Sequence, residues 1–217
     1  MSRTTVPLAP EHLDALSEVI PCSTCAFWEL DPVRRREVDD PAAHKRAWVQ
    51  RVLAEWGSCG RLALVDDVPV GLLLHAPAAY VPGAAAFPTA PVSPDAVLLT
   101  SVRVARGHTG GGLGKMLVQA MARDLVERGD VGAVEAFGDT RGAGRCTVPA
   151  DFLGAVGFGV QRAHPRTPRM RMELRSAVSW RREVGAVLDR LRVVRPPSPR
   201  ASGASRQARR GPGLLTR

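Results

Sequence analysis

The pattern of apolar and polar positions predicts that helices and strands alternate along most of the chain. Apolar residues recur every three or four positions in some segments and every second position in others, which indicates helices and strands respectively. Helices are predicted over residues 13–20, 41–57, 116–128, 147–156 and 178–194. Strands are predicted over residues 26–30, 61–65, 68–76, 96–104, 131–137, 158–164 and 169–175.

Residues that commonly start or stop an element support several of these boundaries. Pro41 stands at the start of one predicted helix and Gly57 at its end. Gly129 follows the last apolar position of the third predicted helix. Asp66 and Asp67 separate two apolar runs, which predicts an antiparallel hairpin.

The order of the elements is irregular: a hairpin, a long loop, a strand–helix–strand unit, a helix and two strands. This order predicts a mixed, mostly antiparallel α/β sheet with helices on both faces, rather than a regular doubly wound array. The loop over residues 76–94 carries five prolines, and long ordered loops often form lids or binding segments. Thr147 is the expected N-cap of the short helix over residues 147–156.

Composition is that of a globular protein with a hydrophobic core. The 217 residues are 45% hydrophobic and 24% charged, which are ordinary values for a folded domain. No apolar run approaches the length of a membrane span, and the N-terminal residues lack the apolar segment of a signal peptide. A cytoplasmic location is therefore expected, with no membrane partner.

The formal net charge of +9 is concentrated at the C-terminal end of the chain. Residues 1–177 carry 20 basic and 19 acidic side chains, whereas residues 178–217 carry ten arginines and two acidic residues. Residues 195–217 consist mainly of Pro, Ser, Gly, Ala and Arg, which predicts a disordered Arg-rich tail. Such a tail binds nucleic acid in some proteins and is merely solvated in others, and both interpretations stay open.

The four cysteines do not indicate a disulfide framework in a chain of this kind. They are Cys22, Cys25, Cys59 and Cys146. Cys22 and Cys25 form a C-x-x-C motif, but no second ligand pair at close spacing accompanies it, so a zinc site is not expected. A redox role for this motif is a minor alternative.

Four glycines fall within five positions between the strand over residues 96–104 and the helix that follows. They are Gly110, Gly111, Gly112 and Gly114. Glycines at such a turn let the main chain approach a phosphate, and the N–H groups of the first helical turn bind the anion. The alternative is a glycine-rich turn without a ligand.

The spacing of these glycines excludes two nucleotide-binding motifs. A P-loop would need glycine at Thr109 and Ser or Thr at Met116. A dinucleotide fingerprint would need glycine at Lys115 or Leu117. The run from Thr109 to Gly114 instead resembles the acyl-coenzyme A signature [QR]-x-x-G-x-[GA] of the GNAT acetyltransferase superfamily, with Thr109 in place of the usual Arg or Gln.

Two later segments resemble the same family. The stretch PADFLGAVGFGVQR looks like its later helix–strand element and PRMRMEL like its closing strand, so the resemblance covers roughly residues 44–175. It implies an acyltransferase core over residues 44–177, with residues 1–43 as an N-terminal segment of the same domain. The helix over residues 178–194 and the tail over residues 195–217 would follow.

The resemblance implies that the strands over residues 96–104 and 131–137 are parallel and splay apart, with acetyl-coenzyme A between them as co-substrate and no metal. Pantetheine would bind main-chain groups near Val102 and Val104, and the glycine loop would bind the pyrophosphate. Arg106 is the nearest candidate for the charge missing at Thr109. The cofactor-binding residues implied in this way are Val102, Arg103, Val104, Thr109, Gly110, Gly111, Gly112, Leu113, Gly114 and Lys115.

Candidate catalytic residues are less clearly marked. Many family members use a tyrosine on the helix after the second gap strand as the acid, but the single tyrosine, Tyr80, lies in the long loop. Cys146 or Thr147, at the start of that helix, is the nearest substitute. For the base, Glu135 interrupts an apolar strand, where a carboxylate either faces the cleft or pairs with a cation. Glu29 is a second candidate on the acceptor side.

The predicted function is transfer of an acetyl or short acyl group from coenzyme A to an amine, on a small molecule or a protein, by direct attack on the thioester. Trp28, Tyr80 and Phe87 would line the acceptor pocket or pack in the core. The alternatives are a non-catalytic acyl-coenzyme A sensor and a nucleic-acid-associated protein that acts through its tail. A homodimer stays open.

Overall fold

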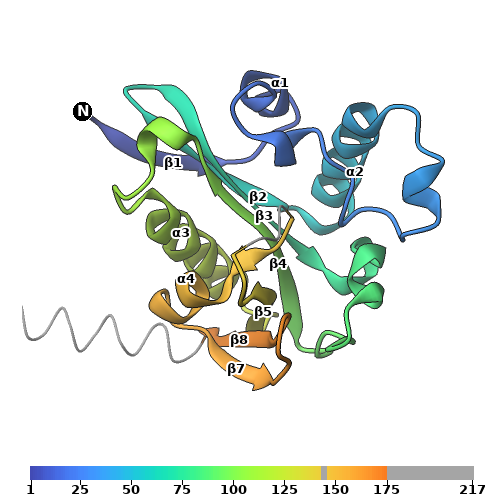
Figure 1. Ribbon diagram of the computed structural model, residues 1–217. Coiled ribbons are helices and arrows are strands. Elements are labelled where there is room, and N and C mark those ends of the chain that lie inside the picture. Colours follow the sequence, from blue (N-terminus) through green and yellow to red (C-terminus); the bar gives the residue numbers. More distant parts are fainter. Residues whose placement is uncertain (143–145, 175–217) are drawn as a thin grey trace, which may run out of the picture. The chain divides into compact units, whose positions relative to one another are not determined.

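A computed structural model describes residues 1–142 and 146–174 of the chain (Figure 1). All of these belong to one compact unit, Met1–Arg181. The helix predicted over residues 178–194 and the tail predicted over residues 195–217 lie outside the described residues.

The described residues form a mixed sheet whose strand order is β1-β2-β3-β4-β5-β8-β7, with β6 paired to β5. The strands are β1 (Arg3–Pro7), β2 (Gly60–Val65), β3 (Val68–Pro77), β4 (Ala96–Val104), β5 (Ala133–Asp139), β6 (Val148–Pro149), β7 (Gly159–Arg162) and β8 (Arg169–Glu173). The β4–β5 and β5–β6 pairs are parallel and the other pairs are antiparallel. The mixed, mostly antiparallel sheet predicted from the sequence is confirmed.

Helices cover both faces of this sheet, as predicted (Figure 1). The helices are α1 (His12–Leu16), α2 (Pro41–Trp56), α3 (Leu113–Arg128) and α4 (Ala150–Ala155), and short 3₁₀ turns occur at Pro21–Ser23, Arg34–Arg36, Ala78–Tyr80, Pro82–Ala86 and Arg106–His108. One core lies between α1, α2 and the sheet, and a second lies between α3, α4 and the opposite face.

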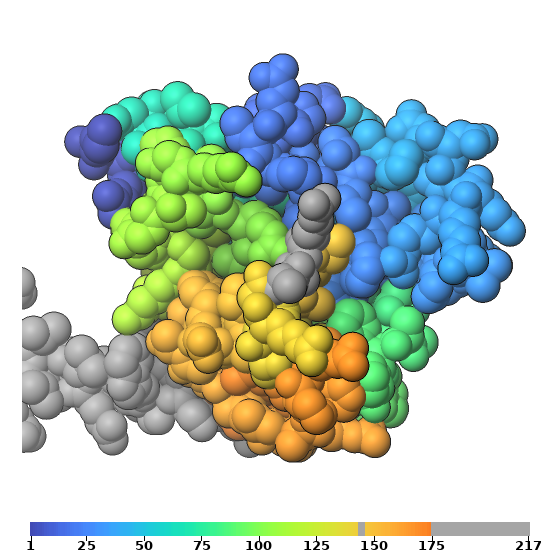
Figure 2. Space-filling view, viewed as in Figure 1, coloured from blue at the N-terminus to red at the C-terminus, as the bar shows by residue number. Residues whose placement is uncertain are grey.

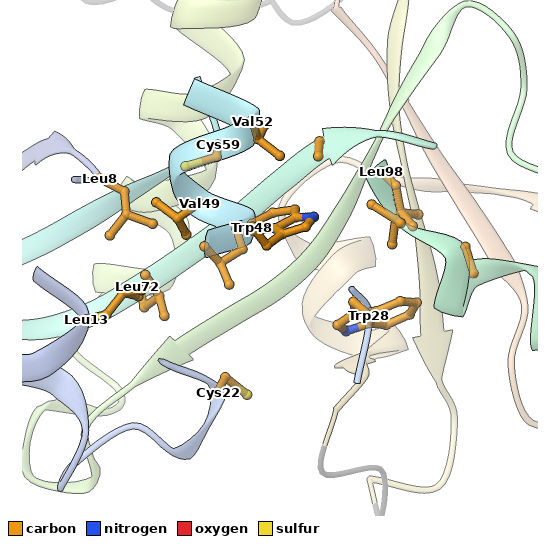
Figure 3. Close-up of a cluster of buried hydrophobic side chains, with 14 of the residues drawn as sticks. Leu8, Leu13, Cys22, Trp28, Trp48, Val49, Val52, Cys59, Leu72 and Leu98 are labelled. Carbon is orange, nitrogen blue, oxygen red and sulfur yellow. The ribbon is translucent and has the colours of Figure 1, made fainter. Parts of the chain in front are cut away.

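The local signals in the sequence set the bounds of α2. The Asp40 carboxylate accepts a hydrogen bond from the Ala43 N–H at 2.9 Å and caps the helix. Gly57 adopts a φ of +85°, which ends the helix in the left-handed conformation that glycine adopts without strain. Trp48 and Val49 then project from α2 into the first core (Figure 3).

The hairpin between β2 and β3 also follows its sequence signal. Asp66 and Asp67 have φ values of +48° and +64°, as a two-residue turn between twisted strands requires. Aspartate tolerates this region better than most residues because its short side chain can bond locally. The predicted antiparallel hairpin is confirmed.

The parallel strands β4 and β5 part soon after they meet. They pair only from Ala96 with Ala133 to Leu98 with Glu135, although both strands continue well beyond these residues. Farther along, β6 pairs with the end of β5 at Gly138. The splayed strand pair expected from the family resemblance is therefore present.

The strand predicted over residues 26–30 is wrong, because this segment forms a turn. Its apolar side chains are buried by packing rather than by strand pairing: Trp28 stacks on Phe87 and Phe137, with ring centroids 5.0 and 6.1 Å apart. A short apolar run fixes burial but not backbone conformation.

Thr147 is not the N-cap of α4, contrary to the prediction. Pro149 occupies that position and α4 begins at Ala150, because Val148 and Pro149 are drawn into pairing with β5. The Thr147 carbonyl accepts a hydrogen bond from Arg103 instead.

The buried His75 on β3 predicts acid sensitivity of the fold. Burial lowers the pKa of His75 to about 4, whereas the unfolded chain protonates near pH 6.5. The unfolded state therefore binds the extra proton between these values, and stability falls as the pH decreases from about 6.5 to 4, by up to about 1.4 kcal/mol per pH unit. Urea unfolding at pH 7 and pH 5 should show a smaller loss for His75→Leu than for the wild type. The His44→Gln control, at a partly exposed position on α2, should keep the wild-type pH dependence.

Candidate active site

The glycine loop before α3 has the conformation of an open anion-binding turn. Gly110 and Gly112 have φ values of +77° and +81°, and a Cβ added to either would meet no atom within 4 Å. Gly112 precedes α3, whose first intrahelical hydrogen bond runs from the Met116 N–H to the Gly112 carbonyl. The earlier N–H groups of the first turn are therefore left for another acceptor.

Gly114 lies at the contact between α3 and α4, and its expected role in cofactor binding stays a prediction. A Cβ at this position would lie 3.1 Å from the ring of Phe152. The absence of a side chain at Gly114 therefore allows α3 to pack closely against Phe152 of α4. Leu113, which was also assigned to the loop, is buried in the core.

Cationic side chains gather at this loop. Arg3 of β1 donates from Nη1 to the Gly111 carbonyl at 2.6 Å, and Arg106 and Lys115 are exposed on the same turn and the first turn of α3. The Thr109 hydroxyl donates to the Arg106 carbonyl at 3.0 Å, so it stabilises the turn itself. Sequence reasoning missed Arg3 because more than a hundred residues separate it from the loop and no local pattern joins them.

The end of β4 presents main-chain groups to the gap beside β5. The Ala105 N–H bonds to Val70 at 2.8 Å and Arg103 is paired with Leu72 on β3. Because the bonding direction alternates along an antiparallel strand, the main chains of Val102 and Val104 face away from β3. This is the side from which β5 has parted.

The side chain of Arg103 spans the same gap. It donates to the Val102 carbonyl at 3.3 Å and to the Thr147 carbonyl at 2.9 Å. It thereby links β4 to the segment just before β6. The guanidinium brings positive charge to the region between the two strands.

Glu135 lies where β4 and β5 are still paired, and its carboxylate is fully buried. It accepts from the Ser93 hydroxyl at 2.6 Å and the Ser93 N–H at 3.1 Å. Arg171 and Arg169 each place a nitrogen 3.3 Å from a carboxylate oxygen. Of the two alternatives for this residue, the ion pair describes its surroundings, and the geometry does not support a role as base.

Glu29 forms a buried ion pair with Lys45 of α2. Both side chains are almost completely inaccessible, and Oε2 of Glu29 has no hydrogen-bond partner. The carboxylate therefore retains one free acceptor oxygen. Its role as an acceptor-side base stays a prediction.

Cys146 and Cys25 line one small pocket together with Ser101 of β4. The indole N–H of Trp28 donates to the Cys146 carbonyl at 2.8 Å, which holds the turn at 26–30 against the segment after β5. Figure 2 shows these blue and yellow-orange parts of the chain meeting on one face of the molecule. Sequence reasoning proposed Cys146 alone, because nothing in the pattern placed Cys25 next to it.

The aromatic residues proposed for the acceptor side separate into two groups. Trp28 and Phe87 belong to one stacked cluster with Phe137, and Trp28 also lines the pocket that contains Cys146. Tyr80 lies against α2 instead: its carbonyl accepts from Trp48 and its ring lies 5.7 Å from the Arg51 guanidinium.

The described residues contain neither a metal-binding cluster nor a membrane-spanning helix. No group of three or more His, Cys, Asp or Glu side chains in residues 1–142 and 146–174 is arranged to hold a metal ion. No helix within the same residues is long and apolar enough to cross a membrane.

Solved structures share this fold. An aminoglycoside acetyltransferase AAC(6')-Ib in complex with coenzyme A is 19% identical, with 83% of this chain and 99% of that chain covered and a TM-score of 0.57. The PaiA N-acetyltransferase of Thermoplasma acidophilum in complex with coenzyme A is 14% identical, with 80% and 99% covered and a TM-score of 0.53. A protein of Desulfovibrio desulfuricans that is assigned to the GNAT family is 18% identical, with 80% and 99% covered and a TM-score of 0.50.

These similarities show that the chain has the fold of the GNAT acetyltransferases. The sequence matches no family model and no curated protein sequence. At identities below 20%, the similarity establishes the fold alone, and activity must be argued from the residues of the site.

The Glu29–Lys45 pair predicts a specific pattern of stability loss. Lys45→Met should lower the free energy of unfolding by about 3–5 kcal/mol, because it leaves the buried Glu29 carboxylate unpaired. The double variant Glu29→Gln/Lys45→Met should recover much of the loss. Arg46→Ala, which breaks the neighbouring exposed pair with Asp14, should cost no more than about 1 kcal/mol. Equal losses for Lys45→Met and Arg46→Ala in urea unfolding would contradict the buried pair.

Proposed function

We propose that the protein is an acyl-coenzyme A-dependent N-acyltransferase that transfers an acetyl or short acyl group to an amine. The observation that carries the proposal is the juxtaposition of a splayed β4–β5 pair with an open glycine turn at the start of α3. Structures with the same fold were determined with coenzyme A bound, including an acetyltransferase that acts on aminoglycosides.

The residues at the loop fit the pyrophosphate of this co-substrate. The free N–H groups of the first turn of α3 and its helix dipole favour an anion without a metal. Arg3, Arg106 and Lys115 add positive charge around the turn. The long polar side chain absent at Thr109 is thus replaced by cations from other positions.

The end of β4 fits the remainder of the co-substrate. The main chains of Val102 and Val104 offer hydrogen-bonding groups to an extended pantetheine arm, and a free N–H in this strand stabilises the oxyanion that forms at the thioester carbonyl. Binding both reactants in the gap converts a bimolecular reaction into an effectively intramolecular one.

The acceptor amine would enter from the side formed by the turn at 26–30 and α2. Trp28 supplies an apolar wall there, and the free oxygen of Glu29 is the candidate proton acceptor. The acceptor itself is proposed only as an amine, because the near-neutral charge of residues 1–177 gives no electrostatic indication of its charge.

A non-catalytic acyl-coenzyme A sensor is the second candidate. It is favoured by the position of Tyr80 against α2 and by the ion pairing of Glu135. Both functions require coenzyme A binding, so turnover separates them.

The glycine turn can be tested by Gly112→Val. Valine at a φ of +81° is strained by about 1–2 kcal/mol, so the turn should rearrange and coenzyme A affinity measured by calorimetry should fall at least tenfold. Gly107→Val is the matched control, because this nearby residue has ordinary φ and open space around its Cβ position. Unchanged affinity for Gly112→Val would reject the phosphate-binding assignment.

Turnover can be tested by release of free thiol from acetyl-coenzyme A across a panel of amines. The proposed enzyme should release thiol faster in the presence of at least one amine than without any, and Gly112→Val should abolish the increase. Tight binding of coenzyme A with no amine-dependent release would favour the sensor.

A further inference from the structure

Three of the four cysteines converge beside the gap between β4 and β5. They come from two segments that are distant in the sequence, and each is a free thiol. A narrow, partly open pocket brings them together, and its walls include Cys22, Cys25, Trp28, Lys45, Ser101 and Cys146. None of the functions assigned so far explains this convergence.

The pocket lies where the two parallel strands have already separated. Ser101 stands beyond Leu98, the last residue of β4 that pairs with β5. Cys146 stands just before β6, which pairs with β5 at Gly138, beyond Glu135. The thiols therefore face the same gap in which the proposed function places the thioester of the co-substrate.

Cys25 and Cys146 line the same pocket, from segments that are distant in the sequence. Interaction with the Cys146 thiol lowers the pKa of Cys25 to about 6, while burial and the Glu29 charge oppose the shift and the Phe27 N–H and the Lys45 charge favour it. The same interaction raises the pKa of Cys146. The arrangement therefore favours a thiolate at Cys25 and a proton at Cys146.

The other two cysteines lack these features. Cys22 and Cys59 are buried, whereas Cys25 and Cys146 are partly exposed. Burial raises the pKa of Cys59 to about 12, which favours the protonated thiol over the nucleophilic thiolate. Cys59 therefore serves as the internal control when the reactivity of Cys25 is measured.

We propose that Cys25 is a nucleophile that accepts the acyl group as a thioester before it passes to the amine, with Cys146 as the residue that holds and returns the proton. This inference rests on the proposed function, since it places a covalent step inside the same acyl transfer. Lys45 and Trp28 are positioning residues: Lys45 places its charge near Cys25, and Trp28 holds the main chain of Cys146.

The first step is a thioester exchange. The Cys25 sulfur attacks the thioester carbonyl carbon and forms a new carbon–sulfur bond, while the bond from that carbon to the co-substrate sulfur breaks. The departing thiolate takes the proton from Cys146. The products are acylated Cys25, a free thiol and the Cys146 thiolate, so one negative charge is present before and after the step.

The second step restores both cysteines. The acceptor nitrogen attacks the carbonyl carbon of acylated Cys25, a carbon–nitrogen bond forms, and the carbon–sulfur bond to Cys25 breaks. In this covalent route the proton lost by the amine returns to Cys146, and Glu29 is the candidate base only for direct transfer. No oxidant, reductant or metal is required, since both steps exchange one acyl bond for another.

The covalent step can be tested with a small thioester that lacks the pyrophosphate, S-acetyl-N-acetylcysteamine. After incubation without an amine and quenching in acid, mass spectrometry of the full-length protein should find one acetyl group, and peptide mapping should place it on Cys25. The Cys25→Ser variant should carry no thioester-linked acetyl group. The Cys59→Ala variant should carry one acetyl group, like the wild type. A folded wild-type protein without an acetyl group on Cys25 would overturn the proposal.

The failure of this inference can be distinguished from failure of the proposed function. Coenzyme A binding to Cys25→Ser, measured by calorimetry, should match the wild type, because the glycine loop is intact. If coenzyme A binds and Cys25 is not acetylated, the covalent carrier is overturned and direct transfer stands. If Cys25 is acetylated by the small thioester but coenzyme A does not bind, the carrier is supported and the proposed co-substrate is rejected.

The role of Cys146 is tested by the pH dependence of Cys25 alkylation with iodoacetamide. The rate in the wild type should reach half its maximum near pH 6. Cys146→Ala should shift this midpoint upward by about 2 pH units, toward the ordinary cysteine value of about 8.5. Cys22→Ala, which changes another wall of the pocket, should leave it near pH 6. A wild-type midpoint near 8.5 would overturn the thiol pair.

Discussion

The strands β4 and β5 are hydrogen-bonded over only three residue pairs, and the candidate site depends on the separation that follows. At the closed end, the buried carboxylate of Glu135 on β5 holds the neighbouring segments together. It bonds to Ser93, just before β4, and to Arg171 of β8. At the open end, β5 pairs with β6 at Gly138 and Asp139 instead of with β4. The gap is therefore built into the hydrogen bonding of the sheet.

Segments outside the sheet complete the site from both of its faces. On one side, the glycine turn and the first turn of α3 offer free N–H groups. Arg3 of the edge strand β1 donates a hydrogen bond to the carbonyl of Gly111 in this turn. On the other side, the turn at 26–30 brings Cys25 to Cys146, and the indole of Trp28 ties the two segments together. The co-substrate and the acceptor are thus proposed to approach the same gap from different faces.

Where the sequence predicted the structure well, the signal was local. The Asp66-Asp67 turn, the Gly57 end of α2 and the Gly129 end of α3 each depend on the backbone conformation that one or two residues prefer. The segment over 26–30 failed because its apolar residues report burial, and a turn packed under aromatic rings is as buried as a strand.

The sequence by itself determined the mixed fold class, the glycine turn and the exclusion of two nucleotide motifs, because periodicity and spacing are properties of short segments. Only the tertiary structure decided which charged and reactive groups meet. It paired Glu135 with arginines of β8 and brought Cys25 beside Cys146. The physical reason is that ion pairing, burial and pKa depend on neighbours in space, and those neighbours come from segments more than thirty residues apart whose pairing no local pattern records.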